Sequence, residues 1–182
     1  SWFWFTYIDD MSIAYTGGGT PISHSGNKSV VIYTAANADA AKYSSHANNL
    51  EHLQGVAQRL SLDDSKKYKL QFFYYRPNLV WGTTDVAANI NHAEKIVVGI
   101  VSSTEANVNT DYTYEEVITL EKTEGWKEYN ITFDLPDIIQ KNPGKSFEKC
   151  AIFFNIVPEI DSAQKTLKTL VNLDDISLTE TK

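Results

Sequence analysis

The fold is decided by the stretch Tyr129-Asn130-Ile131-Thr132-Phe133-Asp134-Leu135, in which every odd position is apolar and every even position is polar. Successive side chains of a β-strand point to opposite faces of its sheet. This alternation is therefore typical of a strand with one buried face. Pro136 follows directly and has no backbone N–H to give to a sheet, so we expect the strand to end there.

A second alternating stretch precedes it in the chain. One face carries Tyr68, Leu70, Phe72 and Tyr74, and the other carries Lys67, Lys69, Gln71, Phe73 and Tyr75. Val56, Leu60 and Leu62 indicate a further strand just before it. The connecting residues Asp63–Lys66 are Asp-rich, which favours a turn, and we expect a hairpin between these two strands.

Further strands complete an all-β pattern. Lys95–Val101 is apolar on both faces and rich in β-branched residues, as in a strand from the middle of a sheet. The other expected strands are Ser29–Thr34, Glu115–Leu120, Cys150–Val157 and Val171–Leu178. Helical signals are limited to single turns at Asn49–Leu53 and Asp137–Lys141. Eight or more strands without alternating helices predict an antiparallel β-sandwich of the jelly-roll type.

Length, composition and charge limit the functions that the protein can have. We expect the 182 residues to form one domain, residues 1–182. The chain has four Trp, ten Tyr and eight Phe, and its 16 Lys and Arg against 23 Asp and Glu give a net charge of −7. Nucleic-acid binding depends on cationic side chains, and so does attraction to an anionic membrane surface. Both partners are therefore disfavoured.

The sequence shows no disulfide pattern, no membrane-spanning stretch and no recognisable signal peptide. The single cysteine, Cys150, excludes an intrachain disulfide framework and a Cys-based zinc cluster, and its apolar neighbours indicate a buried thiol. No apolar stretch approaches the ~20 residues of a membrane span. Ser1 is followed at once by aromatic residues without a basic signal-peptide region, so we expect the sequence to be a piece of a larger protein.

Catalytic motifs are also missing. The four histidines, at positions 24, 46, 52 and 92, lack metal-ligand spacing. Carboxylate pairs such as Asp9 and Asp10 are adjacent in sequence, so on a strand they point apart and do not form the facing pair of a glycosidase. We therefore expect a protein that is not an enzyme.

Four segments carry a resemblance to a known group of proteins. They are Gln54–Leu60 with Lys67–Phe72, then Gly125-Trp126-Lys127-Glu128-Tyr129-Asn130-Ile131-Thr132-Phe133, and finally Val171-Asn172-Leu173-Asp174-Asp175-Ile176-Ser177-Leu178. In this order they resemble the β-sandwich carbohydrate-binding modules of glycoside hydrolases, in the group of families 4, 9 and 22. The usual Asn-Gly-Asp-Phe-Glu-like first strand has no counterpart here.

The resemblance implies a galactose-binding-like jelly roll with a non-catalytic role. Such a module holds a neutral plant-type polysaccharide, such as β-glucan or xylan, near an attached glycoside hydrolase or cell surface, which implies an extracellular or cell-surface location. Two alternatives stay open: a surface adhesin that binds protein, and a jelly-roll polysaccharide hydrolase or lyase.

Sugar rings stack their C–H faces on aromatic side chains and need polar partners for their hydroxyl groups. Trp81 lies between Pro77 and Gly82 in a long irregular stretch, and Tyr75 lies opposite the apolar face of its strand. Trp126 is interpreted instead as a core residue. The candidate sugar-contact residues are Trp81, Tyr75, Arg76, Arg59, Gln71, Trp4 and Tyr43.

A calcium site is implied by the resemblance. In such modules an acidic residue of the last strand helps to bind a structural Ca²⁺, and Asp174 and Asp175 occupy that strand here. Carboxylate oxygens are the hard ligands that Ca²⁺ prefers. The alternative is an ordinary surface pair in which one Asp caps a turn.

Overall fold

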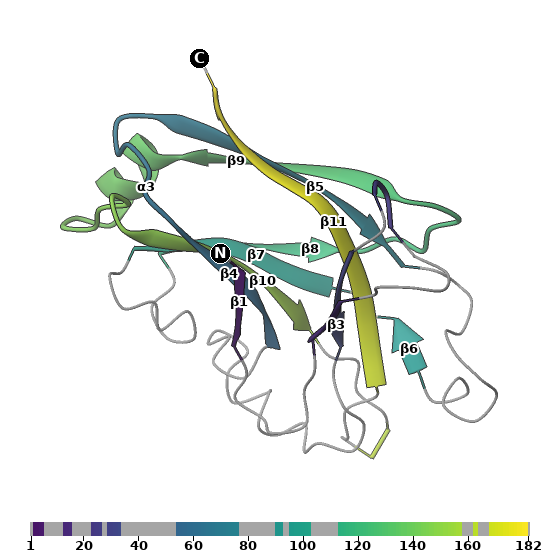
Figure 1. Ribbon diagram of the computed structural model, residues 1–182. Helices are drawn as coiled ribbons and strands as arrows, with labels where there is room; N and C mark the ends of the chain where they lie inside the picture. The colour runs from purple at the N-terminus through teal and green to yellow at the C-terminus, as the bar shows by residue number, and fades with distance from the viewer. Residues whose placement is uncertain are drawn as a thin grey trace.

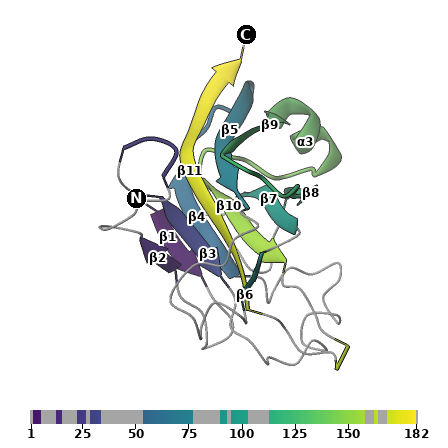
Figure 2. The same cartoon turned by 90° about the vertical axis from the view of Figure 1, so that its right-hand side faces the viewer.

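The computed structural model describes residues 2–5, 13–15, 23–26, 29–33, 54–76, 90–92, 95–102, 113–157, 162–163 and 168–181. They form two β-sheets that face one another (Figures 1 and 2). The predicted all-β antiparallel sandwich is therefore confirmed.

The first sheet has five antiparallel strands. Their order is β1 (Trp2–Phe5), β4 (Gln54–Leu60), β10 (Cys150–Val157), β7 (Lys95–Ser102) and β8 (Tyr114–Thr119). In β7, residues 96–101 are all buried, which confirms the expectation of a strand away from the sheet edge.

The second sheet has six strands. Its order is β2 (Ile13–Tyr15), β3 (Val30–Tyr33), β11 (Lys168–Thr181), β5 (Lys67–Tyr75) and β9 (Lys127–Asp134), and β6 (Ile90–His92) pairs in parallel with the start of β11. The long strand β11 therefore lies between β3 and β5 and joins most of this sheet (Figure 1).

The hydrophobic core fills the space between the sheets. Leu70, Phe72 and Tyr74 of β5 are buried on the inner face, as their alternation predicts. The Phe72 ring meets the Phe154 ring of the opposite sheet edge to face, with centroids 5.1 Å apart. Cys150 is buried in the same core, and burial raises the pKa of its thiol to about 12, as expected of an inert cysteine.

One helix, α3 (Leu135–Lys141), follows β9 directly. The carboxylate of Asp134 caps it by accepting a hydrogen bond from the backbone N–H of Asp137. Pro136 lies in the first helical turn, where its missing N–H costs nothing. The predicted end of the strand and the predicted helical turn are both confirmed. The turn expected at Asn49–Leu53 lies outside the described residues.

The hairpin expected at Asp63–Lys66 is wrong, because β4 and β5 belong to different sheets. The segment does turn, with Ser65 donating to the Asp63 carboxylate, but it crosses from one layer to the other. Leu62 donates its backbone N–H to the Phe147 carbonyl, and Phe147 donates to the Asp64 carboxylate. Turn-forming residues specify a reversal of the chain but not the sheet that the next strand joins.

Of the residues that the structure describes, none forms a helix long and apolar enough to cross a membrane.

Candidate functional site

The β5 residues whose side chains point away from the core lie on the outer face of the six-stranded sheet. Gln71, Phe73 and Tyr75 are half-buried there, in alternation with the buried Leu70, Phe72 and Tyr74. The prediction that Gln71 and Tyr75 face outward is confirmed.

Four rings gather on this face, and we call Phe73, Tyr75, Trp126 and His24 the aromatic cluster. Trp126 lies beside Tyr75, with ring centroids 5.6 Å apart and planes tilted by 33°. The His24 imidazole stacks on Phe73 at 3.6 Å and 13°, and it meets Trp126 edge to face at 6.1 Å. Trp126 is half-buried and belongs to this cluster, so its interpretation as a core residue is wrong.

A buried polar clamp holds Trp126 near Tyr75. Arg76 donates its backbone N–H to the Thr123 hydroxyl at 3.0 Å, and Thr123 donates its backbone N–H to the Arg76 carbonyl at 3.0 Å. The Arg76 guanidinium donates through Nη1 to the Leu120 carbonyl at 2.9 Å. Because Arg76 is only 8% exposed, the structure places this candidate sugar-contact residue beneath the surface.

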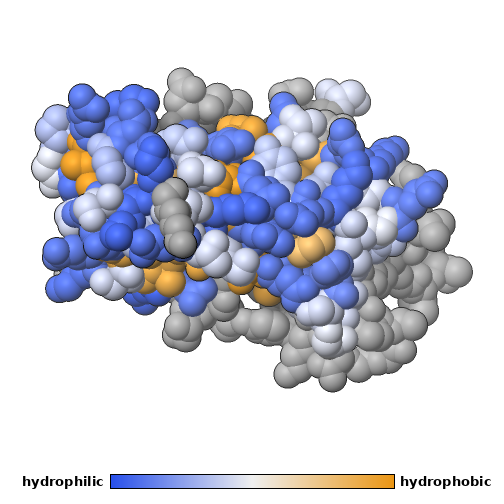
Figure 3. Space-filling model, turned by 90° about the horizontal axis from the view of Figure 1, so that it is seen from above, coloured by the Kyte–Doolittle hydropathy of each residue, from blue (hydrophilic) through white to orange (hydrophobic). Residues whose placement is uncertain are grey.

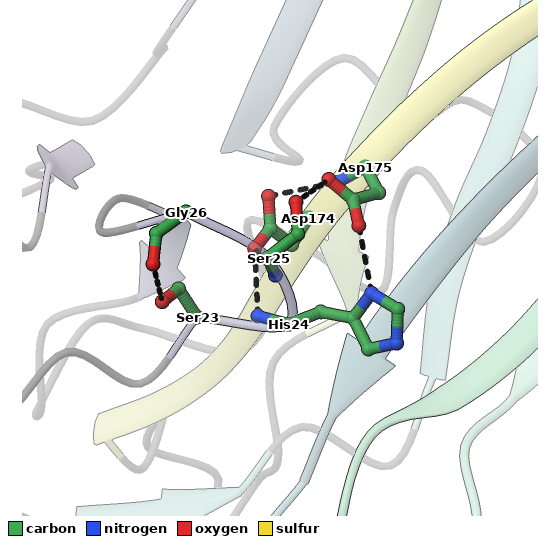
Figure 4. A network of polar contacts seen from close by, with 6 residues as sticks. All are labelled: Ser23, His24, Ser25, Gly26, Asp174 and Asp175. Carbon is green, nitrogen blue, oxygen red and sulfur yellow. Dashed lines mark hydrogen bonds and ion pairs between the residues drawn. The ribbon is translucent and has the colours of Figure 1, made fainter.

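The remaining ring of the cluster comes from a distant part of the chain. His24 belongs to the segment Ser23–Gly26, which Asp174 and Asp175 of β11 hold against the sheet (Figure 4). One Asp174 oxygen, Oδ2, accepts from the backbone N–H groups of His24 and Ser25 at 2.7 and 3.3 Å. Asp175 bonds the Ser25 hydroxyl through Oδ1 at 2.5 Å and His24 Nδ1 through Oδ2 at 2.7 Å.

An irregularity in β11 brings the two carboxylates to this position. The pairing with β5 shifts between Asp174 and Ser177, and Asp175 has a φ of 46°, a left-handed conformation that Asp tolerates better than most residues. The hydrogen bonds from Ser25 and His24 hold the pKa of the Asp175 carboxyl below its usual value. This carboxylate is therefore ionised at neutral pH.

The carboxylate oxygens of Asp174 and Asp175, the residues of the predicted calcium site, all take part in hydrogen bonds. The remaining Asp174 oxygen, Oδ1, accepts from the backbone N–H of Asp175, so all four carboxylate oxygens meet protein N–H or O–H donors. A cation bound by these oxygens would have to share them with those donors. The described residues also contain no group of three or more potential metal ligands. Calcium binding stays a prediction.

Polar groups surround the aromatic cluster on the same face. Gln71 aligns with Asn130 of β9 on one side and with Ser177 of β11 on the other. Asn130 donates to the carboxylate of Glu128, whose position aligns with Phe73. Viewed from above, the molecule shows mainly hydrophilic side chains with small, separate hydrophobic areas (Figure 3). Amide, hydroxyl and carboxylate groups are thus available beside the rings.

Arg59 lies on the other sheet. It is exposed on β4 and points away from Val56 and the core, but β4 is not the neighbour of β5. The outer face around it is largely buried, including Ala57 and Phe153. Arg59 and Tyr75 therefore lie in different sheets and do not form one site.

The structure gives no side-chain geometry for the other candidate sugar-contact residues. Trp81 and Tyr43 lie outside the described residues, and Trp4 is placed only as the partner of Val56 in the register of β1 with β4. Conversely, His24 and Ser25 were missed. About 150 positions separate them from their aspartate partners, so no local pattern could have paired them.

The fold is that of known carbohydrate-binding modules. A family 4 module matches 99% of this chain and 86% of its own, with a TM-score of 0.57 and 14% identity. A family 61 module, solved in complex with β-1,4-galactotriose, matches over 99% and 88% with a TM-score of 0.52 and 12% identity. An adhesin domain of the Lys-gingipain of Porphyromonas gingivalis matches over 100% and 91%, with a TM-score of 0.50 and 12% identity. No family model and no curated protein matches the sequence.

Proposed function

We propose that this protein is a non-catalytic carbohydrate-binding module whose ligand-binding surface is the outer face of the six-stranded sheet. The observation that carries the proposal is the aromatic cluster. Tyr75 and Trp126 are both half-buried, with centroids 5.6 Å apart, so part of each ring is open to solvent. Such rings offer an apolar surface to the C–H face of a sugar.

The ligand in this proposal is a neutral polysaccharide or oligosaccharide, such as β-glucan or xylan. Asp174, Asp175 and Glu128 lie around the cluster, and the chain carries a net charge of −7. An anionic glycan would be repelled by this charge, whereas the hydroxyl groups of a neutral glycan can donate to carboxylate and amide oxygens. The structural likeness to a module bound to β-1,4-galactotriose supports a neutral glycan.

The proposal extends to the biological setting. Like the carbohydrate-binding modules that it resembles, the protein would act outside the cell or on its surface, covalently linked to a catalytic or anchoring domain. Its task would be to keep that domain close to the polysaccharide.

Affinity electrophoresis tests the proposal. Wild-type protein should be retarded in gels that contain soluble xylan, mixed-linkage β-glucan, glucomannan or galactan, and no retardation by any of them would refute it. Tyr75→Ala and Trp126→Ala should each weaken binding by about 5- to 30-fold, since stacking and apolar burial of one ring contribute roughly 1–2 kcal/mol. Val117→Ala is the control, because Val117 is an exposed apolar side chain (57%) on the other sheet.

An Arg59→Ala variant separates the two sheets. If it abolishes binding while Tyr75→Ala and Trp126→Ala do not, the ligand binds the five-stranded sheet and our choice of face is wrong. Release of soluble sugars from the same polysaccharides would instead reveal a hydrolase or lyase.

The likeness to the gingipain adhesin domain supports a second candidate, a protein-binding adhesin. An adhesin would show no retardation by any glycan.

A further inference from the structure

His24 holds an unusual position for a surface histidine. Its ring lies flat on Phe73 and its edge faces Trp126, and the side chain is 34% exposed. The ring is therefore fixed in place within the aromatic cluster while part of it remains open to solvent. A side chain in this position can touch any ligand that stacks on Trp126 or Tyr75.

The contact with Asp175 fixes the tautomer of this ring. An ionised carboxylate only accepts hydrogen bonds, so the 2.7 Å contact between Asp175 Oδ2 and Nδ1 places the proton on Nδ1. In the neutral imidazole the other nitrogen, Nε2, then carries a lone pair. Among the residues that the structure describes, none donates to Nε2, and this lone pair can accept a hydrogen bond.

We propose that His24 is a sugar-contact residue, whose Nε2 accepts a hydrogen bond from a ligand hydroxyl group, and that Asp175 is the positioning residue that maintains this tautomer. The proposal rests on the proposed function. It adds a fixed, directional acceptor to the stacking surfaces of the cluster, and such polar contacts orient a bound sugar ring.

Asp174 and Ser25 complete the arrangement. Asp174 accepts from two consecutive backbone N–H groups, and the Ser25 hydroxyl occupies the second oxygen of Asp175. These bonds fix the main chain on both sides of the His24 Cα. The acidic pair, for which the resemblance implies calcium, thus acts here as an anchor for the peptide that carries His24.

Long-range ¹H–¹⁵N correlation spectra of the histidine rings test the tautomer without any glycan. We expect His24 to show a protonated Nδ1 and an unprotonated Nε2, and a protonated Nε2 with a bare Nδ1 would overturn the proposal. In Asp175→Asn the amide group can donate to Nδ1, so the ring should switch to the Nε2-protonated form.

Binding measurements with the glycan that most retards the wild type test the contact. His24→Phe keeps a ring on Phe73 but lacks the acceptor, so we expect a loss of about 3- to 10-fold, the size of one hydrogen bond. Asp175→Asn should lose a similar factor, and the double variant should lose no more than either alone. Asp137→Asn, on α3, is the matched control and should bind like the wild type.

The outcomes separate this inference from the proposed function. If Trp126→Ala abolishes binding but His24→Phe and Asp175→Asn bind normally, the His24 contact is refuted and the carbohydrate-binding function stands. If the losses in the two single variants multiply in the double variant, Asp175 does not act through His24. If the wild type binds no glycan, both fail together.

Discussion

The clamp between Thr123 and Arg76 gives the sharpest prediction for stability. Thr123 is 3% exposed and its hydroxyl accepts the backbone N–H of Arg76, also buried, at 3.0 Å. Thr123→Val keeps the shape of the side chain but replaces this acceptor with a methyl group. The N–H of Arg76 is then left buried without its partner.

An unsatisfied buried donor costs about 1–3 kcal/mol of unfolding free energy. For a domain of this size, 1 kcal/mol lowers Tm by roughly 2–4 °C, so a loss near the middle of that range lowers Tm by about 4–8 °C. Thr123→Ser keeps the oxygen and loses only a methyl group, so it should retain most of the stability.

Urea unfolding and calorimetry measure both variants. The tryptophan spectrum should also change in Thr123→Val, because the clamp fixes the loop that carries Trp126 beside Tyr75. If Thr123→Val and Thr123→Ser unfold at the same temperature, the hydrogen bond contributes nothing net and the clamp does not position the cluster.

Four other perturbations have defined outcomes. Gly55→Ala should destabilise the fold strongly or prevent folding, because a Cβ there would lie 1.8 Å from the Phe154 carbonyl oxygen; wild-type-like urea unfolding would contradict that packing. The Cys150 thiol, with its pKa raised to about 12 by burial, should react with Ellman's reagent only after unfolding. The pKa of the Asp175 carboxyl is lowered in the folded state. The contribution of this carboxyl to the free energy of unfolding is therefore complete at pH values above the unfolded-state pKa near 3.8, and it is lost as the pH falls below that value. The acid-induced drop in Tm should be smaller in Asp175→Asn. If Ca²⁺ binds Asp174 and Asp175, a chelator should lower Tm and added Ca²⁺ should restore it, whereas a Tm that the chelator leaves unchanged would refute the calcium prediction.

Alternation predicted β5 well because its inner face is buried and its outer face is partly exposed, whereas β10 is buried on both faces and is apolar along most of its length. The boundaries of β10 match the expected Cys150–Val157, and β5 places Leu70, Phe72 and Tyr74 inward as the pattern requires. The partners of the strands were less predictable. Asp63–Lys66 reads as a local turn, yet the choice of sheet depends on contacts with Phe147 far along the chain.

The candidate site could be predicted only in part, for the same reason. The alternation of β5 placed Gln71 and Tyr75 on the outer face. The face to which a strand residue points can be predicted from its neighbours in the sequence alone. Trp126 was misjudged because its interpretation as a core residue came from the resemblance to carbohydrate-binding modules, and the residue itself precedes β9. His24 reaches the face through Asp175, and no sequence spacing encodes that contact.

The irregularity in β11 has a consequence for changes in chain length. Asp175 and Ile176 together oppose the single residue Phe72, while Leu173 and Leu178 on either side both align with inward residues of β5. Deleting Asp175 would leave Ile176 opposite Phe72 and keep every later residue on its present face. A deletion at Thr179 would instead invert the remainder of the strand. Position 175 is thus a place in β11 where the chain can lose a residue without disturbing the core, at the cost of the anchor for His24.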